Sequence, residues 1–299
     1  MIVGRLEQRY EQISFSGGGL RCFWQGGAVD ELRTVLPLEP KRITAASGGA
    51  LAAACFISKQ GPALMEAFHE RLKEQDDNFH LEPAANLKQM TPHQQLYRDV
   101  VEDVLGAKAC DRIAQGPEFQ VLLARPPRFL PKRVGAALTM ALYEVDKLIR
   151  STPHGRYPQA AGASEMRVDG REAAREGRLS DLVCIAATIP PVFRIKRWNG
   201  QPVIDAATID NAPLPRQHSG RTLVLLTRSY RNLPLEEGRT YLAPSSATPA
   251  DKIDFTDAAS LQATYDQGRR DIRSILGTEH RHIRPQAAST LDRPQYNKC

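Results

Sequence analysis

Strand-like and helix-like segments alternate over the first sixty residues of the chain. Glu11–Phe15 alternates between polar and apolar residues as a strand does, and Arg42–Ala46 is a short run that is typical of a buried strand. Phe23–Val35 has apolar residues at helical spacing, and Gly48–Lys59 is rich in small and apolar helix formers. This alternation predicts a parallel sheet with helices packed against it.

A different pattern fills the middle of the chain. Leu96–Leu105 and Val134–Ile149 have helical periodicity, and a basic, proline-rich link at 125–133 separates them. Strand-like runs resume at Glu165–Val168 and at Arg221–Leu226. We therefore expect a single α/β domain over residues 1–299, with a helical lid or insertion at about 75–160.

The end of the chain is predicted to form one helix and a polar tail, at about 256–299. Thr256–Leu276 has helical periodicity, and the residues beyond Gly277 are polar and include proline. The apolar side of this helix contains Leu261, Tyr265, Ile272 and Leu276, and its charged face contains Arg269, Arg270 and Arg273.

The composition is moderately basic, with 40 Lys and Arg residues against 34 Asp and Glu residues and a formal net charge of +6. This excess favours anionic surfaces as partners. The first residues lack the apolar core of a signal peptide, and no segment approaches the ~18 apolar residues of a membrane span. We expect a cytoplasmic protein with peripheral contact to anionic membranes, and the sequence leaves its oligomeric state open.

The cysteines show neither a CxxC pair nor the Cys/His spacing of a metal site. Their number is odd, which argues against a complete set of disulfides. We expect free thiols in a reducing compartment, no bound metal and no cofactor. The five cysteines are Cys22, Cys55, Cys110, Cys184 and Cys299.

Three glycines stand between the first predicted strand and its helix. Gly17, Gly18 and Gly19 permit positive φ and leave no side chain in the way of an anion, and Arg21 adds a cation. Neither G-x-x-x-x-G-K-[ST] nor G-x-G-x-x-G is present, so a nucleotide site is the weaker interpretation. The segment through Leu20 and Arg21 is a candidate oxyanion-binding loop.

Ser47 falls where a predicted strand turns directly into a predicted helix. This is the context of a nucleophile elbow, in which a tight turn lifts a hydroxyl clear of the sheet and a helix N-terminus stabilises negative charge. Gly48 and Gly49 fit the crowding of such a turn, although Ala45 stands where the usual G-x-S-x-G has glycine. The alternative role for Ser47 is an ordinary helix N-cap.

A carboxylate that can serve as a base follows much later in the chain. Gln201–Ile204 is a plausible strand leading to Asp205, and the small Ala206 and Ala207 leave room for its side chain to face a neighbouring loop. A solvated turn or a helix cap is the alternative for such an aspartate. Together with the glycine loop and Ser47, Asp205 indicates a serine hydrolase.

Histidines offer a second arrangement, a Ser-His-Asp triad in the chain order Ser, Asp, His. His218, His280 and His282 all follow Asp205, but His218 lies in a predicted turn and the other two lie in a polar, basic stretch. The four earlier histidines, including His154, show no pairing in the sequence. Only chain order supports a triad.

Four segments of the chain resemble the patatin-like phospholipase family. GGGLRC at 17–22 matches its oxyanion loop, AASGG at 45–49 its serine elbow, and DAATIDNAP at 205–213 its aspartate segment. A further match is AATIPPVF at 186–193, the segment that precedes the aspartate strand. The resemblance covers roughly residues 10–230, with little that is specific between 75 and 165.

The resemblance implies a three-layer α/β/α fold and a lipid acyl hydrolase of the phospholipase A or lysophospholipase type. It also implies a catalytic dyad of Ser47 and Asp205 without histidine, and no cofactor. The expected oxyanion donors are the N–H groups of Gly18, Gly19 and Leu20, with that of Gly48 as a further candidate. Three small residues depart from the family pattern, namely Cys22, Ala45 and Ala206 in place of glycine. They keep open a weakened, lipid-binding relative, and an acyltransferase would use the same dyad.

The basic link also raises a surface hypothesis. Phe129 and Leu130 lie among Arg125, Arg128, Lys132 and Arg133, so we expect the region of about 96–149 to form a lid and membrane-docking surface rather than core. Inward packing of the apolar pair is the alternative. Nucleic acid is not the expected partner, because no nucleic-acid motif is present and aromatic residues make up only 6% of the chain.

Overall fold

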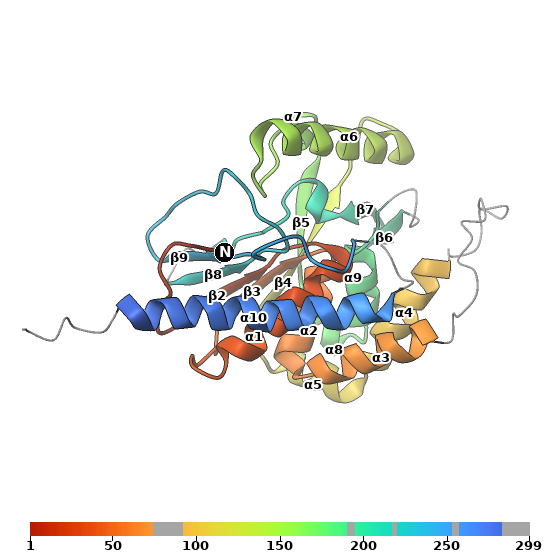
Figure 1. Ribbon diagram of the computed structural model, residues 1–299. Helices are drawn as coiled ribbons and strands as arrows, with labels where there is room; N and C mark the ends of the chain where they lie inside the picture. Colours follow the sequence, from red (N-terminus) through yellow and green to blue (C-terminus); the bar gives the residue numbers. More distant parts are fainter. Residues whose placement is uncertain (74–91, 190–194, 217–219, 253–256, 283–299) are drawn as a thin grey trace, which may run out of the picture.

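The computed structural model describes residues 1–73, 92–189, 195–216, 220–252 and 257–282 (Figure 1). In these ranges nine strands form one sheet in the order β1-β9-β8-β2-β3-β4-β7-β6, with β5 also paired to β4. The strands are β1 (Ile2–Val3), β2 (Gln12–Phe15), β3 (Arg42–Ala46), β4 (Glu118–Arg125), β5 (Ser164–Asp169), β6 (Lys196–Trp198), β7 (Gln201–Asp205), β8 (Thr222–Leu225) and β9 (Arg239–Leu242).

The middle of the sheet is parallel, as the alternating pattern predicts. Every neighbouring pair in the run β9-β8-β2-β3-β4 is parallel, and the pairs β1–β9, β4–β5, β4–β7 and β6–β7 are antiparallel. All residues of β2, β8 and β9 are buried. Both faces of these strands are therefore covered, and their polar residues, such as Gln12, Ser14 and Thr240, are buried as well.

Helices cover the two faces of the sheet unequally, which gives three layers (Figure 1). The large hydrophobic core lies between the sheet and the helices of one layer, whereas α6 and α7 stand over the opposite face on a small cluster that includes Ala136 and Ile204. The first layer contains α1 (Phe23–Leu32), α2 (Gly48–Ser58), α3 (Gly61–Lys73), α4 (Pro92–Val104), α5 (Ala107–Ala114), α8 (Gly170–Arg175), α9 (Leu179–Ala186) and α10 (Ala258–His282). The second contains α6 (Lys132–Arg150) and α7 (Tyr157–Ala160).

The expected three-layer α/β/α architecture is thus present, but the expected helical insertion at 75–160 is not helical throughout. β4 lies inside that range and pairs with β3, β5 and β7. Leu96, Val100 and Val101 of α4 are 4%, 0% and 0% exposed, so α4 belongs to the core rather than to a lid. Among the described residues of this range, α6 and α7 are the helices that stand on the opposite face of the sheet, because α5 precedes β4 on one face and α6 follows it on the other.

The long helix α10 packs tightly against α1, which follows the glycine loop. A Cβ atom added to Gly27 would overlap the carbonyl oxygen of Tyr265, and one on Gly268 would overlap that of Trp24. Glu31 of α1 binds Arg269 and Arg273 at 3.2 and 2.8 Å. Close packing and these ion pairs together hold α10 against α1, behind the glycine loop.

Within the described ranges, no helix has both the length and the apolar character needed to cross a bilayer.

Candidate active site

Ser47 and Asp205 meet in the interior although 158 residues separate them. The Ser47 hydroxyl donates a hydrogen bond of 2.6 Å to Asp205 Oδ2, and the two residues are 1% and 0% exposed. β4 brings them together, because Ala46 pairs with Leu122 on one of its edges and Asp205 pairs with Leu123 on the other. The strand that sequence analysis did not predict is therefore the scaffold of the pair.

The backbone of Ser47 has φ 53° and ψ −138°, a conformation that residues other than glycine rarely adopt. β3 ends at the preceding residue and α2 begins at the next, so the serine stands on a sharp turn at a helix N-terminus. A Cβ on Gly48 would lie 2.7 Å from the Gly19 carbonyl oxygen, and one on Gly49 would lie 2.5 Å from that of Ser16. The two glycines are therefore required by the close approach of the glycine loop.

The second carboxylate oxygen of Asp205 is fixed as well. Oδ1 accepts a hydrogen bond of 2.8 Å from the Ala207 N–H, and the Asp205 N–H donates to the Thr188 carbonyl at 2.9 Å. Burial raises the pKa of the Asp205 carboxyl above its usual value, while the charge of Lys252 and the hydrogen bonds from Ser47 and Ala207 act in the opposite direction. A fixed carboxylate with a raised pKa is a suitable acceptor for the serine proton.

Only part of the predicted oxyanion loop is free to bind an anion. Gly17 donates its N–H to the Asn211 carbonyl at 2.8 Å, and Leu20 donates to the Lys252 carbonyl at 3.2 Å. Arg21 binds Asp251 at 2.8 Å on the surface. Within the described ranges, the N–H groups of Gly18 and Gly19 have no acceptor. The prediction that Leu20 is an oxyanion donor is therefore wrong, because its N–H already donates to the Lys252 carbonyl.

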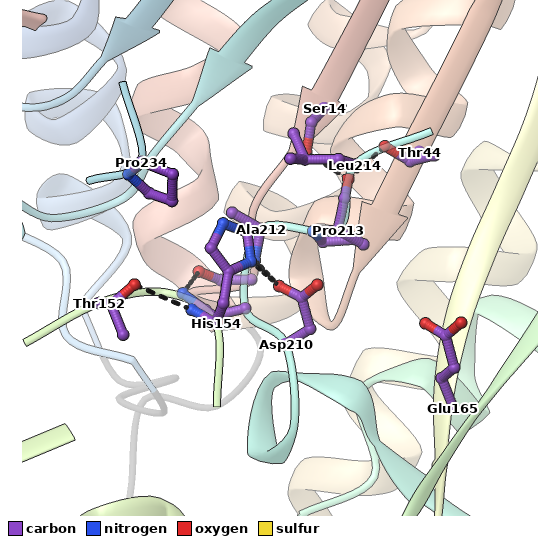
Figure 2. A network of polar contacts seen from close by, with 12 residues as sticks. Ser14, Thr44, Thr152, His154, Glu165, Asp210, Ala212, Pro213, Leu214 and Pro234 are labelled. Carbon is purple, nitrogen blue, oxygen red and sulfur yellow. Dashed lines mark hydrogen bonds and ion pairs between the residues drawn. The ribbon is translucent and has the colours of Figure 1, made fainter. Parts of the chain in front are cut away.

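The segment after Asp205 holds the ends of β2 and β3 in place (Figure 2). The Pro213 carbonyl accepts hydrogen bonds from Ser14 Oγ at 2.8 Å and Thr44 Oγ1 at 2.5 Å. Asn211 Nδ2 donates to Tyr230 Oη at 2.7 Å and to the Gly17 carbonyl at 3.3 Å. The aspartate segment thus supports both the glycine loop and the serine strand.

An interaction between His154 and Asp210, which sequence analysis did not predict, involves this segment. His154 Nδ1 is 2.9 Å from Asp210 Oδ1 (Figure 2). The neighbouring Gly155 N–H donates to the Ile209 carbonyl at 2.8 Å. His154 therefore fastens the loop after α6 to the aspartate segment, with no hydrogen bond to Ser47 or Asp205. Of the histidines considered for a triad, His218 lies outside the described residues, and His280 and His282 belong to the last turn of α10.

A pocket with mostly apolar walls opens at Ser47. Its empty volume is about 570 Å³, part of which is open to solvent. Such a space suits a hydrocarbon chain attached to a carbonyl group at the serine. Its apolar walls include Leu20, Phe23, Leu51, Leu64, Phe68 and Ile189.

Two further residues at this pocket were not predicted. Lys252 lines the pocket, and its positive charge offsets part of the rise that burial causes in the pKa of Asp205. The Lys252 carbonyl also accepts the hydrogen bond from the Leu20 N–H in the glycine loop. Tyr97 of α4 also lines it, is 7% exposed, and has a hydroxyl without a hydrogen-bond partner in the described part of the chain. Lys252 lies in a loop and Tyr97 on a core helix, so neither carries a sequence signal of its position.

The three residues that replace glycine in the family pattern are buried without a clash. Cys22, Ala45 and Ala206 are 6%, 0% and 0% exposed, and Ala206 packs against Ala46 and Leu122. Burial raises the pKa of the Cys22 thiol well above its ordinary value, which disfavours the thiolate form. The replacements fit the site and leave Ser47, Asp205 and the glycine triplet unchanged.

The family model described as "Patatin-like phospholipase" matches residues 13–216. The match begins in β2 and ends after the aspartate segment, so it includes the glycine loop, the serine turn and β7. Among curated proteins, none matches the chain.

Proposed function

Because the chain belongs to the patatin-like phospholipase family, we propose that it cleaves carboxylic ester bonds of lipids with Ser47 as nucleophile and Asp205 as general base. The family consists of lipid acyl hydrolases in general, and the phospholipase A or lysophospholipase type is the specific activity that we propose. The observation that carries the proposal is the buried hydrogen bond of 2.6 Å between the serine hydroxyl and the aspartate, at the end of an apolar pocket.

The reaction begins when Ser47 Oγ attacks the carbonyl carbon of the ester and its proton moves to Asp205 Oδ2. The carbonyl oxygen becomes an oxyanion that accepts hydrogen bonds from the N–H groups of Gly18 and Gly19. When the tetrahedral intermediate collapses, the carbon–oxygen bond to the leaving alcohol breaks, and the alcohol takes the proton from Asp205. The products of this half-reaction are an acyl ester on Ser47 and a free alcohol or lysolipid.

Water then completes the cycle. Asp205 accepts a proton from the water molecule as it attacks the acyl carbonyl, and returns the proton to Ser47 Oγ when the fatty acid leaves. An alcohol that reached the same intermediate would give acyl transfer instead. The apolar pocket supports a fatty acyl chain as the group held on the serine.

Hydrolysis of a soluble p-nitrophenyl ester by the recombinant protein tests the dyad. Ser47→Ala and Asp205→Asn should each lower kcat/KM by about 10³-fold or more, and the double variant should be no worse than the poorer single variant, because the residues act as one unit. Circular dichroism provides the control for folding. Activity that survives in Asp205→Asn but disappears in His218→Ala or His280→Ala would replace the dyad with a triad.

A further inference from the structure

Exposed apolar side chains are concentrated on one element of the structure. In the described part of the chain, nine large hydrophobic residues are exposed, and five of them lie between residues 129 and 149. Those five are Phe129 at 74%, Val134 at 53%, Val145 at 44%, Leu148 at 80% and Ile149 at 65% exposure. Such a concentration marks an interaction surface, because the other four exposed large hydrophobic residues of the described ranges are far apart in the sequence.

The spacing of these residues defines a continuous stripe on α6. Gly135, Ala136, Thr139 and Asp146 form the buried side of the helix. The opposite side presents Val134, Ala137, Ala141, Val145 and Leu148 at intervals of three and four residues, all of them exposed. A helix of a globular protein normally packs such a stripe against the core, whereas α6 directs it toward solvent.

Contacts at the end of α6 hold the stripe in this orientation. Buried Asp146 accepts hydrogen bonds from the backbone N–H groups of Arg156 and Tyr157 and binds Arg150 at 3.2 Å. Asn232 Nδ2 donates to the Arg150 carbonyl at 2.6 Å, which places the 231–235 loop beside the helix end. That loop carries Leu235, a further exposed apolar residue at 74%. The stripe is therefore anchored to the fold and cannot turn inward without breaking these bonds.

Positive charge surrounds the stripe. Residues 125–150 contain six Lys and Arg residues and two acidic ones. The acidic residues are already paired, Glu144 with Lys147 and Asp146 with Arg150. Lys132 and Arg133, at the first turn of α6, are exposed and have no ion pair within the described ranges. The free charge on this surface is therefore cationic.

We propose that the outer face of α6, with Phe129 and the basic residues Lys132 and Arg133, docks on anionic lipid bilayers. Apolar side chains of the stripe enter the boundary of the acyl chains, and Lys132 and Arg133 bind the anionic headgroups. The proposal rests on the proposed function, since a lipid hydrolase meets its substrate in a bilayer. The buried side of α6 packs on Ile204 and Ile209, which flank Asp205, so docking occurs about one helix diameter, ~10 Å, from the aspartate segment.

A second copy of the chain fits this surface less well. In a parallel pair of α6 helices the two basic first turns would be adjacent, and like charges side by side are unfavourable. In an antiparallel pair the basic first turn would face the ion pairs Glu144–Lys147 and Asp146–Arg150 of the other copy, which leave Lys132 and Arg133 without a free anionic partner. An anionic bilayer satisfies the apolar and the basic residues at once.

Sedimentation with vesicles of phosphatidylcholine and phosphatidylglycerol tests the proposal without any turnover. At low salt, Leu148→Ser should weaken binding about tenfold, whereas Val35→Ser, which removes an apolar residue 49% exposed in the turn after α1, should not. Lys132→Gln/Arg133→Gln should weaken it about 30-fold, the equivalent of about 1 kcal/mol per charge. Lys108→Gln/Arg270→Gln, with the same change of charge elsewhere, should have little effect.

Two controls separate this proposal from the proposed chemistry. Ser47→Ala should bind vesicles as the wild type does, and Leu148→Ser should hydrolyse a soluble ester at the wild-type rate. Equal binding by Leu148→Ser and Val35→Ser would overturn the docking surface. So would light scattering that shows a dimer of the wild type which Leu148→Ser dissociates, because the occupant of the stripe would then be a second copy.

Discussion

Asp205 combines two requirements that oppose each other. Its complete burial raises the pKa of the carboxyl, which makes it a stronger base, but a base must be ionised before it can accept a proton. Lys252 offsets part of the cost of burial, because its positive charge favours the carboxylate. The balance between these two effects determines the pH at which the dyad becomes active.

Lys252→Met should move the acidic limb of the pH profile of kcat/KM to higher pH. Removal of the cation raises the pKa of Asp205 further, so a higher pH is needed to ionise the base. The measurement is hydrolysis of a soluble ester from pH 4 to pH 9. Arg21→Met is the matched control, since Arg21 pairs with Asp251 and does not contribute to the pKa of Asp205. An acidic limb that stays in place in Lys252→Met would show that this lysine does not act on the base.

Sequence analysis predicted site residues that lie in a recognisable motif and missed those whose position depends on tertiary structure alone. The sequence around Ser47, Asp205 and the glycine triplet indicates a turn or a strand end. Lys252 acts on Asp205 from a loop near the far end of the chain. His154 meets Asp210 across 56 residues, a pairing that the chain order alone does not indicate.

At the level of elements, α1, α2, α4, α6 and α10 were predicted, as were β2, β3, β5, β7 and β8. The shorter helices α3, α5, α7, α8 and α9 and the strands β1, β4, β6 and β9 were not. The apolar faces of α1, α2, α6 and α10 are long enough to show helical periodicity. β4 is a short apolar run between two helical regions, and a run of that length does not distinguish a buried strand from part of a helix. The missed strand separates the expected insertion into a core helix, α4, and an outer helix, α6.

The contact between α1 and α10 gives a prediction at this scale. Gly27→Ala should lower the free energy of unfolding by about 2–3 kcal/mol, and the melting temperature by about 5 °C or more, because the new methyl group meets the backbone of α10. Gly26→Ala is the matched control: its methyl group would lie 3.5 Å from the Tyr265 ring, an ordinary contact. Alanine is the better helix former, so Gly26→Ala should be neutral or slightly stabilising. Thermal denaturation of both variants decides, and equal melting temperatures would contradict the close crossing.

At the scale of the whole molecule, the site depends on parts of the chain outside the family match. The match ends at residue 216, yet β8 pairs with β2 directly beneath the glycine loop, and Thr227 donates a hydrogen bond of 2.7 Å to the Gly17 carbonyl. α10 packs behind the same loop through α1. The arrangement of the proposed dyad therefore depends on elements beyond the family match as well as on those within it.

The central claim is that this fold activates Ser47 through Asp205, and covalent labelling with a fluorophosphonate tests it most directly. Intact-mass spectrometry of the wild type should show one adduct, and peptide mapping should place it on Ser47. Ser47→Ala should gain no adduct. Asp205→Asn should be labelled at least about 10²-fold more slowly than the wild type, because the base is missing. An adduct on another residue, or labelling of Asp205→Asn at the wild-type rate, would contradict the account.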